Sequence, residues 1–145
     1  MAQNLVQTLT GWENLPMLRK LHLRKNKIDK IGNAEEEMPD LPALEYINLR
    51  RNNIEKLEVL EKLFQFKALT DINVLNNPID LNASSKELLF AQVLQKNPAI
   101  KRFNKQQTTE KNLLQAVHYG QYKFEKEEKE RKRLEALEAA KKDDE

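Results

Sequence analysis

The sequence predicts an α/β solenoid, in which short parallel strands line a concave face and helices or turns cover the convex face. Three observations support this fold class. A pattern of apolar residues and one asparagine occurs three times, beginning at Leu18, Leu44 and Leu69, which are 26 and 25 residues apart. Within each copy, apolar and polar residues alternate, as in a strand with one buried face. After the third copy the period changes, as expected where a solenoid closes.

The asparagine of each copy stands where the chain turns away from the strand, at Asn26, Asn52 and Asn77. An asparagine amide supplies two donors and an acceptor, which can satisfy the backbone groups of adjacent turns. We therefore expect the three side chains to form a ladder inside the solenoid, with a structural and not a catalytic role. The period lies within the range of about 20 to 29 residues that is typical of leucine-rich repeats.

Past the third copy, the sequence predicts a cap that seals the core. Ser84 and Glu87 have the spacing of a capping box, which indicates the start of an apolar helix. A turn at Asn97 and Pro98 then precedes one last edge strand within 97–104. We expect the solenoid with its cap to occupy 1–104, followed by an extended, charged helical tail over 105–145.

The composition excludes several kinds of site. The 145 residues include no cysteine and only two histidines, which excludes disulfides and thiolate metal sites and leaves few other metal ligands. The sequence offers no paired nucleophile and base and no phosphate-cradling glycine loop, so neither catalysis nor a cofactor is expected. No apolar run approaches the roughly 20 residues that cross a bilayer, so we expect a soluble intracellular protein without a membrane partner.

The polar strand positions should face the open, concave side, where a partner could bind. Because neighbouring strands lie about 5 Å apart, Arg24 and Arg50 should lie side by side and form a basic corner. The candidate partner-binding residues are Lys20, His22, Arg24, Lys25, Tyr46, Asn48, Arg50 and Arg51. This surface either binds an acidic protein or is only a solvated charged face. Nucleic acid is not expected, since the net charge is only +2 and no aromatic stripe accompanies the arginines.

From about Thr108 the composition becomes that of a charged helix. Oppositely charged residues at four-residue spacing support the helix, while Gly120 weakens it. A helix that is polar on all sides either bridges open solvent or lies on another protein. Sustained heptads are missing, so we do not expect self-association through a coiled coil. The tail side chains expected to contact a partner are Tyr119, Tyr122, Phe124, Leu134 and Leu137.

Segments in a fixed order carry a family resemblance. They are the run from Leu15 to Asp29, the acidic insert that ends at Met38 and Pro39, Tyr46–Asn52, Val74–Pro78 and a cap followed by a charged helix. Together they resemble the leucine-rich repeat-containing protein 23 family, which are radial-spoke components of motile cilia. The resemblance extends roughly from Leu9 to Leu134. It implies a structural protein of the cytoplasm and cytoskeleton, located in the axoneme of a cilium or flagellum, with other radial-spoke proteins as partners.

Two alternatives to the radial spoke remain open at the level of sequence. One is a leucine-rich-repeat adaptor in an RNA-processing complex, and the other is a regulatory subunit of a phosphatase or dynein complex. All three hypotheses predict protein–protein interaction and not catalysis.

Overall fold

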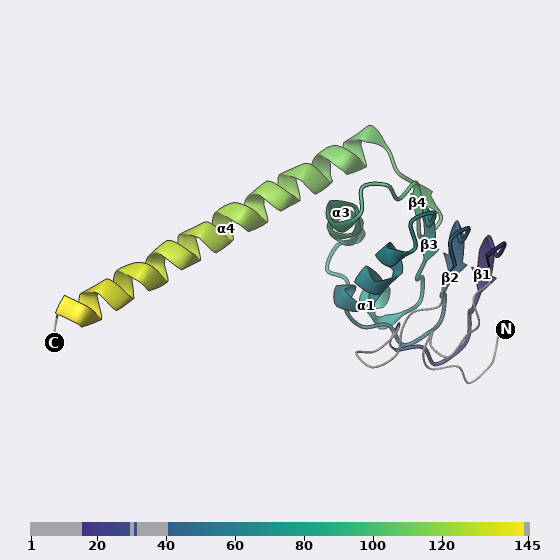
Figure 1. Cartoon of the computed structure of the whole chain (residues 1–145), viewed down its shortest axis with the longest axis horizontal. Helices are drawn as coiled ribbons and strands as arrows, with labels where there is room; N and C mark the ends of the chain where they lie inside the picture. The colour runs from purple at the N-terminus through teal and green to yellow at the C-terminus, as the bar shows by residue number, and fades with distance from the viewer. Residues whose placement is uncertain (1–15, 30, 32–40, 144–145) are drawn as a thin grey trace.

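The computed structural model describes residues 16–29, 31 and 41–143, and its centre is a sheet with the strand order β1-β2-β3-β4-β5 (Figure 1). The parts of the predicted solenoid at 1–15, 30 and 32–40 lie outside these residues. The strands are β1 Lys20–His22, β2 Tyr46–Asn48, β3 Asp71–Asn73, β4 Arg102–Phe103 and β5 Gln106–Gln107. Strands β1 to β4 pair in parallel, and β5 pairs antiparallel to β4. The predicted α/β solenoid with parallel strands is confirmed.

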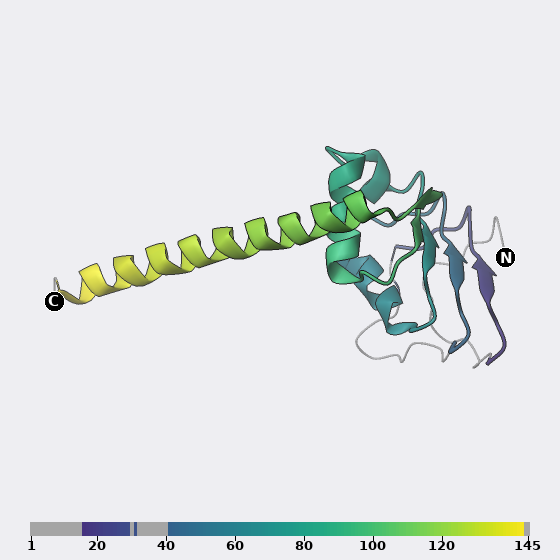
Figure 2. The ribbon, with the colours of Figure 1, turned by 90° about the horizontal axis from the view of Figure 1, so that it is seen from above.

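The helices that precede the tail lie on one side of the sheet, as Figure 2 shows for α1 and α3. They are α1 Leu57–Glu61, its continuation as the 3₁₀ helix η1 Lys62–Gln65, α2 Pro78–Leu81 and α3 Lys86–Lys96. Among the helices that the structure describes, none combines the length and the apolar character needed to cross a membrane. No helix among the described residues covers the opposite face of the strands (Figure 2).

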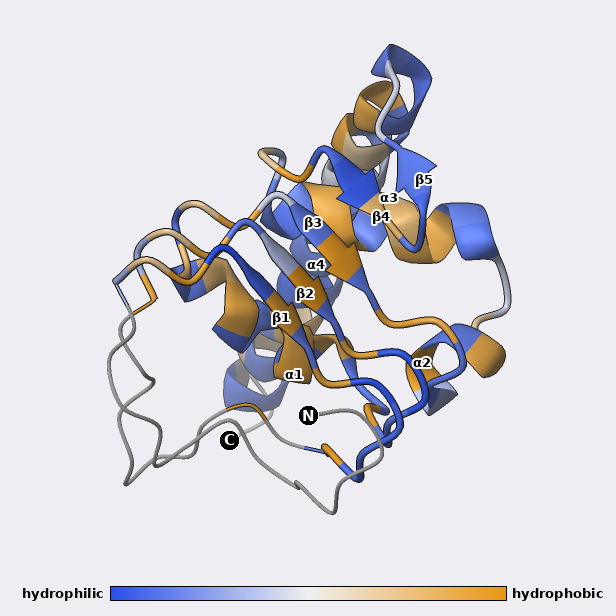
Figure 3. Cartoon of the chain, turned by 90° about the vertical axis from the view of Figure 1, so that its right-hand side faces the viewer, coloured by the Kyte–Doolittle hydropathy of each residue, from blue (hydrophilic) through white to orange (hydrophobic). Residues whose placement is uncertain are grey.

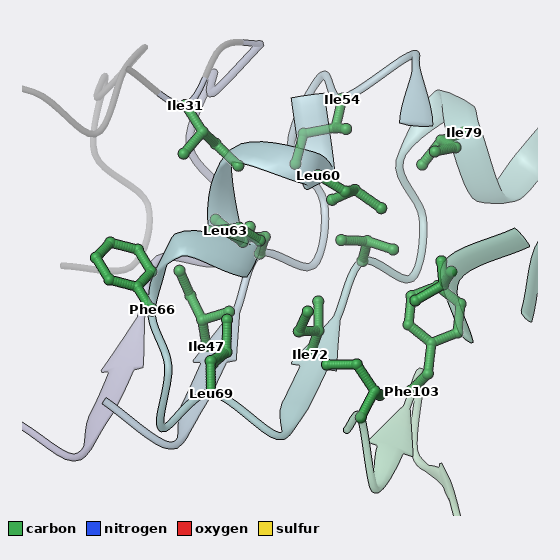
Figure 4. Packing of buried hydrophobic residues seen from close by; sticks show 14 of the residues in the cluster. Ile31, Ile47, Ile54, Leu60, Leu63, Phe66, Leu69, Ile72, Ile79 and Phe103 are labelled. Atoms are coloured by element: carbon green, nitrogen blue, oxygen red, sulfur yellow. The ribbon is translucent and has the colours of Figure 1, made fainter. Parts of the chain in front are cut away.

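The hydrophobic core lies between the sheet and these helices (Figure 4). Ile47 of β2 and Ile72 of β3 are paired in register, and both are fully buried. Leu60 of α1 and Leu63 of η1 are buried on the facing side. Complete burial of an aliphatic side chain of this size contributes about 1.5–3 kcal/mol. Because β1, β2 and β3 each direct only one aliphatic residue toward the helices, neighbouring repeats must stack to complete the core.

The asparagines that end the repeats are buried between successive turns. The Nδ2 group of Asn52 donates hydrogen bonds of 2.9 Å to the carbonyl oxygens of both Leu23 and Leu49. Its Oδ1 atom accepts a bond of 3.0 Å from the backbone N–H of Ile28. Asn77 makes the equivalent bonds one repeat further along the chain. The amides of Asn52 and Asn77 therefore each join their own turn to the preceding one.

The cap differs from the sequence-based prediction at two positions. Ser85, and not Ser84, is the N-cap residue of α3, and its Oγ accepts a hydrogen bond of 3.2 Å from the N–H of Leu88. The last predicted strand is β4, and it is not an edge strand, because β5 pairs with the side of β4 that faces away from β3. The chain reverses through Asn104 and Lys105, whose φ angles of 50° and 68° match the paired positive angles of a tight hairpin turn.

The tail forms the continuous helix α4 Glu110–Asp143, which is 34 residues long and points away from the sheet (Figures 1 and 2). Its first turns pack on α3, where Ala116 is buried and the side-chain amide of Gln92 donates a hydrogen bond of 3.3 Å to the Tyr119 hydroxyl. Further along, Arg131 forms ion pairs with Glu128 and Glu135. Such exposed pairs support a helix by only about 0.2–0.5 kcal/mol each.

Replacing Gly120 by alanine is expected to stabilise the protein by up to about 1 kcal/mol, because glycine is a poor helix former. A Cβ atom at this position would lie 3.3 Å from Cγ of Gln95, and that side chain is exposed and flexible enough to turn aside. The midpoint of urea unfolding measures the change. A lower midpoint in the variant would show instead that α4 and α3 need the glycine for their close approach.

Candidate functional site

The candidate site lies on the open face of the sheet, where polar side chains form rows across the strands. Hydrophilic and hydrophobic residues alternate along the strands, as Figure 3 shows by colour. The register aligns Lys20, Tyr46 and Asp71 in one row. His22 and Asn48 are aligned in the next row. The predicted partner-binding residues on β1 and β2 therefore lie next to one another on a single surface.

Tyr46 is the aromatic centre of this surface. Its ring lies against His22, with 5.2 Å between the ring centroids and an angle of 52° between the planes. Burial and the neighbouring Asp71 carboxylate raise the pKa of the Tyr46 hydroxyl. Burial also raises the pKa of Asp71, although the nearby Arg102 opposes that shift. The Tyr46 hydroxyl therefore stays protonated at neutral pH and can donate a hydrogen bond to a partner.

Asn48 is held by the backbone of its own turn. Its Oδ1 atom accepts a hydrogen bond of 3.0 Å from the N–H of Arg50. Asn73 makes the same bond with Leu75 one repeat further along. These bonds fix the path of the chain as it leaves the strand. Asn48 thus fixes the backbone position of Arg50.

The turns after β1 and β2 form a cationic hollow, which is lined by Arg24, Lys25, Arg50 and Arg51. Its volume is about 200 Å³. The N–H of Lys25 donates a hydrogen bond of 2.9 Å to the carbonyl oxygen of Arg50, which holds the two turns side by side. The Nε atom of Arg50 is buried and has no hydrogen-bond partner among the described residues. The expected neighbourhood of Arg24 and Arg50 is thus present, and it is concave.

A comparison with known families identifies the repeat unit. A family model described as "Leucine-rich repeat" matches residues 1–132. The chain is a leucine-rich repeat protein. Among solved structures, a chain of the Drosophila melanogaster SNF/U2A' complex is similar, with a TM-score of 0.71 and 28% sequence identity over 81% of this chain. The present chain spans 64% of the length of that relative. No curated protein sequence matches it significantly.

The tail residues proposed to contact a partner lie apart from the open face of the leucine-rich repeats. Tyr119 packs on α3, whereas Tyr122 and Phe124 are 62% and 64% exposed. Leu134 and Leu137 lie nearer the free end of α4, and each is 49% exposed. Because α4 points away from the sheet, these side chains and the cationic hollow form separate surfaces (Figure 2).

Sequence reasoning missed a groove between α3 and α4, with a volume of about 670 Å³. Its apolar lining includes Leu94 of α3 and Val117 and Phe124 of α4. The helical spacing of Leu113, Val117 and Phe124 contained this signal, but only Phe124 was among the residues predicted to contact a partner. Within the described parts of the chain, no group of three or more histidine, aspartate or glutamate side chains could hold a metal ion.

Proposed function

We propose that this leucine-rich repeat protein is a non-enzymatic scaffold that grips an acidic segment of another protein on the open face of its sheet. The single observation that carries this proposal is the cationic hollow, which gathers Arg24, Lys25, Arg50 and Arg51 from two repeats. Complementary charge on a partner would steer its approach and fix its register. Tyr46 and His22 supply an adjoining aromatic contact, as is common in protein interfaces.

The assembly that we propose is the radial spoke of the ciliary or flagellar axoneme, with other radial-spoke proteins as partners. The support is the resemblance in sequence to the leucine-rich repeat-containing protein 23 family. This resemblance extends over the cap and the charged helix. The proposed location is accordingly the cytoskeleton of a motile cilium. In such an assembly α4 would extend from the leucine-rich repeats toward a second contact, reached through Tyr122, Phe124, Leu134 and Leu137.

A second candidate is an adaptor in an RNA-processing complex. The observation that favours it is the structural similarity to a chain of the SNF/U2A' complex. In both candidate functions the chain acts by binding a protein. The same experiment on the open face of the sheet therefore tests both. The phosphatase and dynein alternatives have no comparable support among the solved structures reported above.

Cross-linking mass spectrometry on isolated axonemes would identify the partner and the binding face together. Lys20 and Lys25 lie on β1 and in the turn after it, while the exposed Lys62 of η1 and Lys67 in the turn after η1 lie outside the hollow and serve as an internal control. We expect lysine cross-links from Lys20 and Lys25 to an acidic segment of a radial-spoke protein. The same cross-links to an RNA-processing protein in nuclear extract would favour the second candidate. Cross-links made only through Lys62 and Lys67 would contradict the proposed face.

A further inference from the structure

We propose that the cationic hollow is a binding site for a phosphate group, presented by a phosphorylated side chain of the protein partner. This inference rests on the proposed function and specifies the chemistry of the same surface. The described residues that line the hollow are all cationic: Arg24, Lys25, Arg50 and Arg51. Four like charges held together repel one another, and a doubly charged anion between them would offset that repulsion.

The size of the hollow fits such a group. Its volume of about 200 Å³ is several times the roughly 30 Å³ that one water molecule occupies in the liquid. A tetrahedral phosphate therefore fits in the hollow. Arginine is suited to this ligand because its planar guanidinium offers parallel N–H donors to two oxygen atoms of one phosphate.

The environment of Arg50 adds an independent observation. Its Nε atom is buried and has no hydrogen-bond partner among the described residues, although nearly all buried donors in proteins have one. Arg50 also lines the hollow. A small rotation of its side chain toward a phosphate oxygen would give this N–H an acceptor. The unpaired donor therefore belongs to one of the residues that line the hollow.

The backbone at Lys25 and Arg51 supports the same conclusion and supplies the best test. Their φ angles of 57° and 58° lie in the left-handed region, where asparagine is tolerated better than lysine or arginine. The equivalent residue in the third repeat is Asn76, with a φ of 59°. The first two repeats thus carry cations at a position that the third fills with the residue that the conformation favours. Asparagine at both positions should preserve the turns and remove two charges.

The test is a titration of the full-length, ¹⁵N-labelled protein with inorganic phosphate and, separately, with acetate, followed by NMR. We expect saturable shifts of the backbone amides of Lys25 and Arg51, with phosphate binding at least about tenfold more tightly than acetate. The variant carrying Lys25→Asn and Arg51→Asn should bind phosphate about tenfold more weakly than the natural chain. Its urea midpoint should be no lower, which shows that the turns remain folded.

The matched control carries Lys62→Asn and Lys67→Asn, which remove the same charge from exposed positions outside the hollow and should leave phosphate affinity unchanged. Equal affinity for phosphate and acetate would overturn the proposal, as would equal losses in the two double variants. No partner protein is needed for these measurements, so they are independent of the proposed function. Capture of a partner without phosphate binding would overturn the phosphate site and leave the scaffold role. Phosphate binding without capture of a partner would overturn the scaffold role, and with it the partner as the source of the phosphate.

Discussion

Replacing Asn52 by alanine is expected to lower the free energy of unfolding by about 3–5 kcal/mol, because several buried backbone groups lose their partner together. The side chain satisfies the carbonyl oxygens of Leu23 and Leu49 and the N–H of Ile28. Water cannot replace these bonds, since Asn52 is only 5% exposed. A loss of this size is a large part of the roughly 5–15 kcal/mol that stabilises a typical domain.

Asn53 provides the matched control for this substitution. It follows Asn52 directly and has an exposed side chain. Asn53→Ala should therefore change stability by no more than about 0.5 kcal/mol. Urea unfolding followed by circular dichroism measures both variants. Similar midpoints for the two variants would show that the asparagine ladder does not hold the repeats together.

Phe103→Ala is expected to cost about 3–5 kcal/mol, which makes it the second large effect. Phe103 is 3% exposed at the end of the parallel sheet, and its ring stacks on Phe90 of α3 with 5.6 Å between the centroids. Truncation leaves a cavity where the cap covers the last repeat, and the neighbouring strand and helix cannot both collapse into it. The loss should therefore appear in the cooperative unfolding of the whole solenoid.

The control for Phe103 is Phe124→Ala, which removes the same ring from a site that is 64% exposed. This variant should lie within about 1 kcal/mol of the natural protein, because little of the ring is buried. Calorimetry or urea unfolding distinguishes the two. Equal destabilisation would mean that the groove between α3 and α4 contributes as much to stability as the buried ring in the cap.

The repeat pattern was sufficient to predict the sheet because each residue in it has one physical task. Leu21, Ile47 and Ile72 alternate with polar neighbours, and the structure aligns them in register across β1, β2 and β3. The start of the helix in the cap was harder to predict from sequence. Ser84 and Ser85 are chemically identical candidates for the N-cap, and only the path of the preceding turn selects Ser85.

The hairpin that adds β5 had almost no sequence signal. Its turn residues, Asn104 and Lys105, both adopt positive φ, a geometry for which Asn-Gly is the usual signature. Gly120 was interpreted as a weak point of the helix, whereas the structure places it opposite Gln95 at a close approach between α4 and α3. Both features arise from tertiary packing, which local propensity does not contain.

The candidate site was partly accessible from sequence for the same reason as the sheet. Strand spacing alone predicts that Arg24 and Arg50 are neighbours. The concavity of the surface and the buried Nε atom of Arg50 depend on how the two turns are held together. Sequence spacing does not reveal that geometry.

The central claim is that the cationic hollow binds a protein partner, and the most direct test is the affinity for the partner identified by cross-linking. The variant carrying Arg24→Glu and Arg50→Glu should bind at least about tenfold more weakly, because two attractive charges become repulsive. A variant carrying Lys62→Glu and Lys67→Glu makes the same change in net charge at exposed positions outside the hollow and should bind like the natural chain. Circular dichroism of the two double variants would check that each is folded. Unchanged affinity in the arginine variant, or equal weakening in both, would contradict the account.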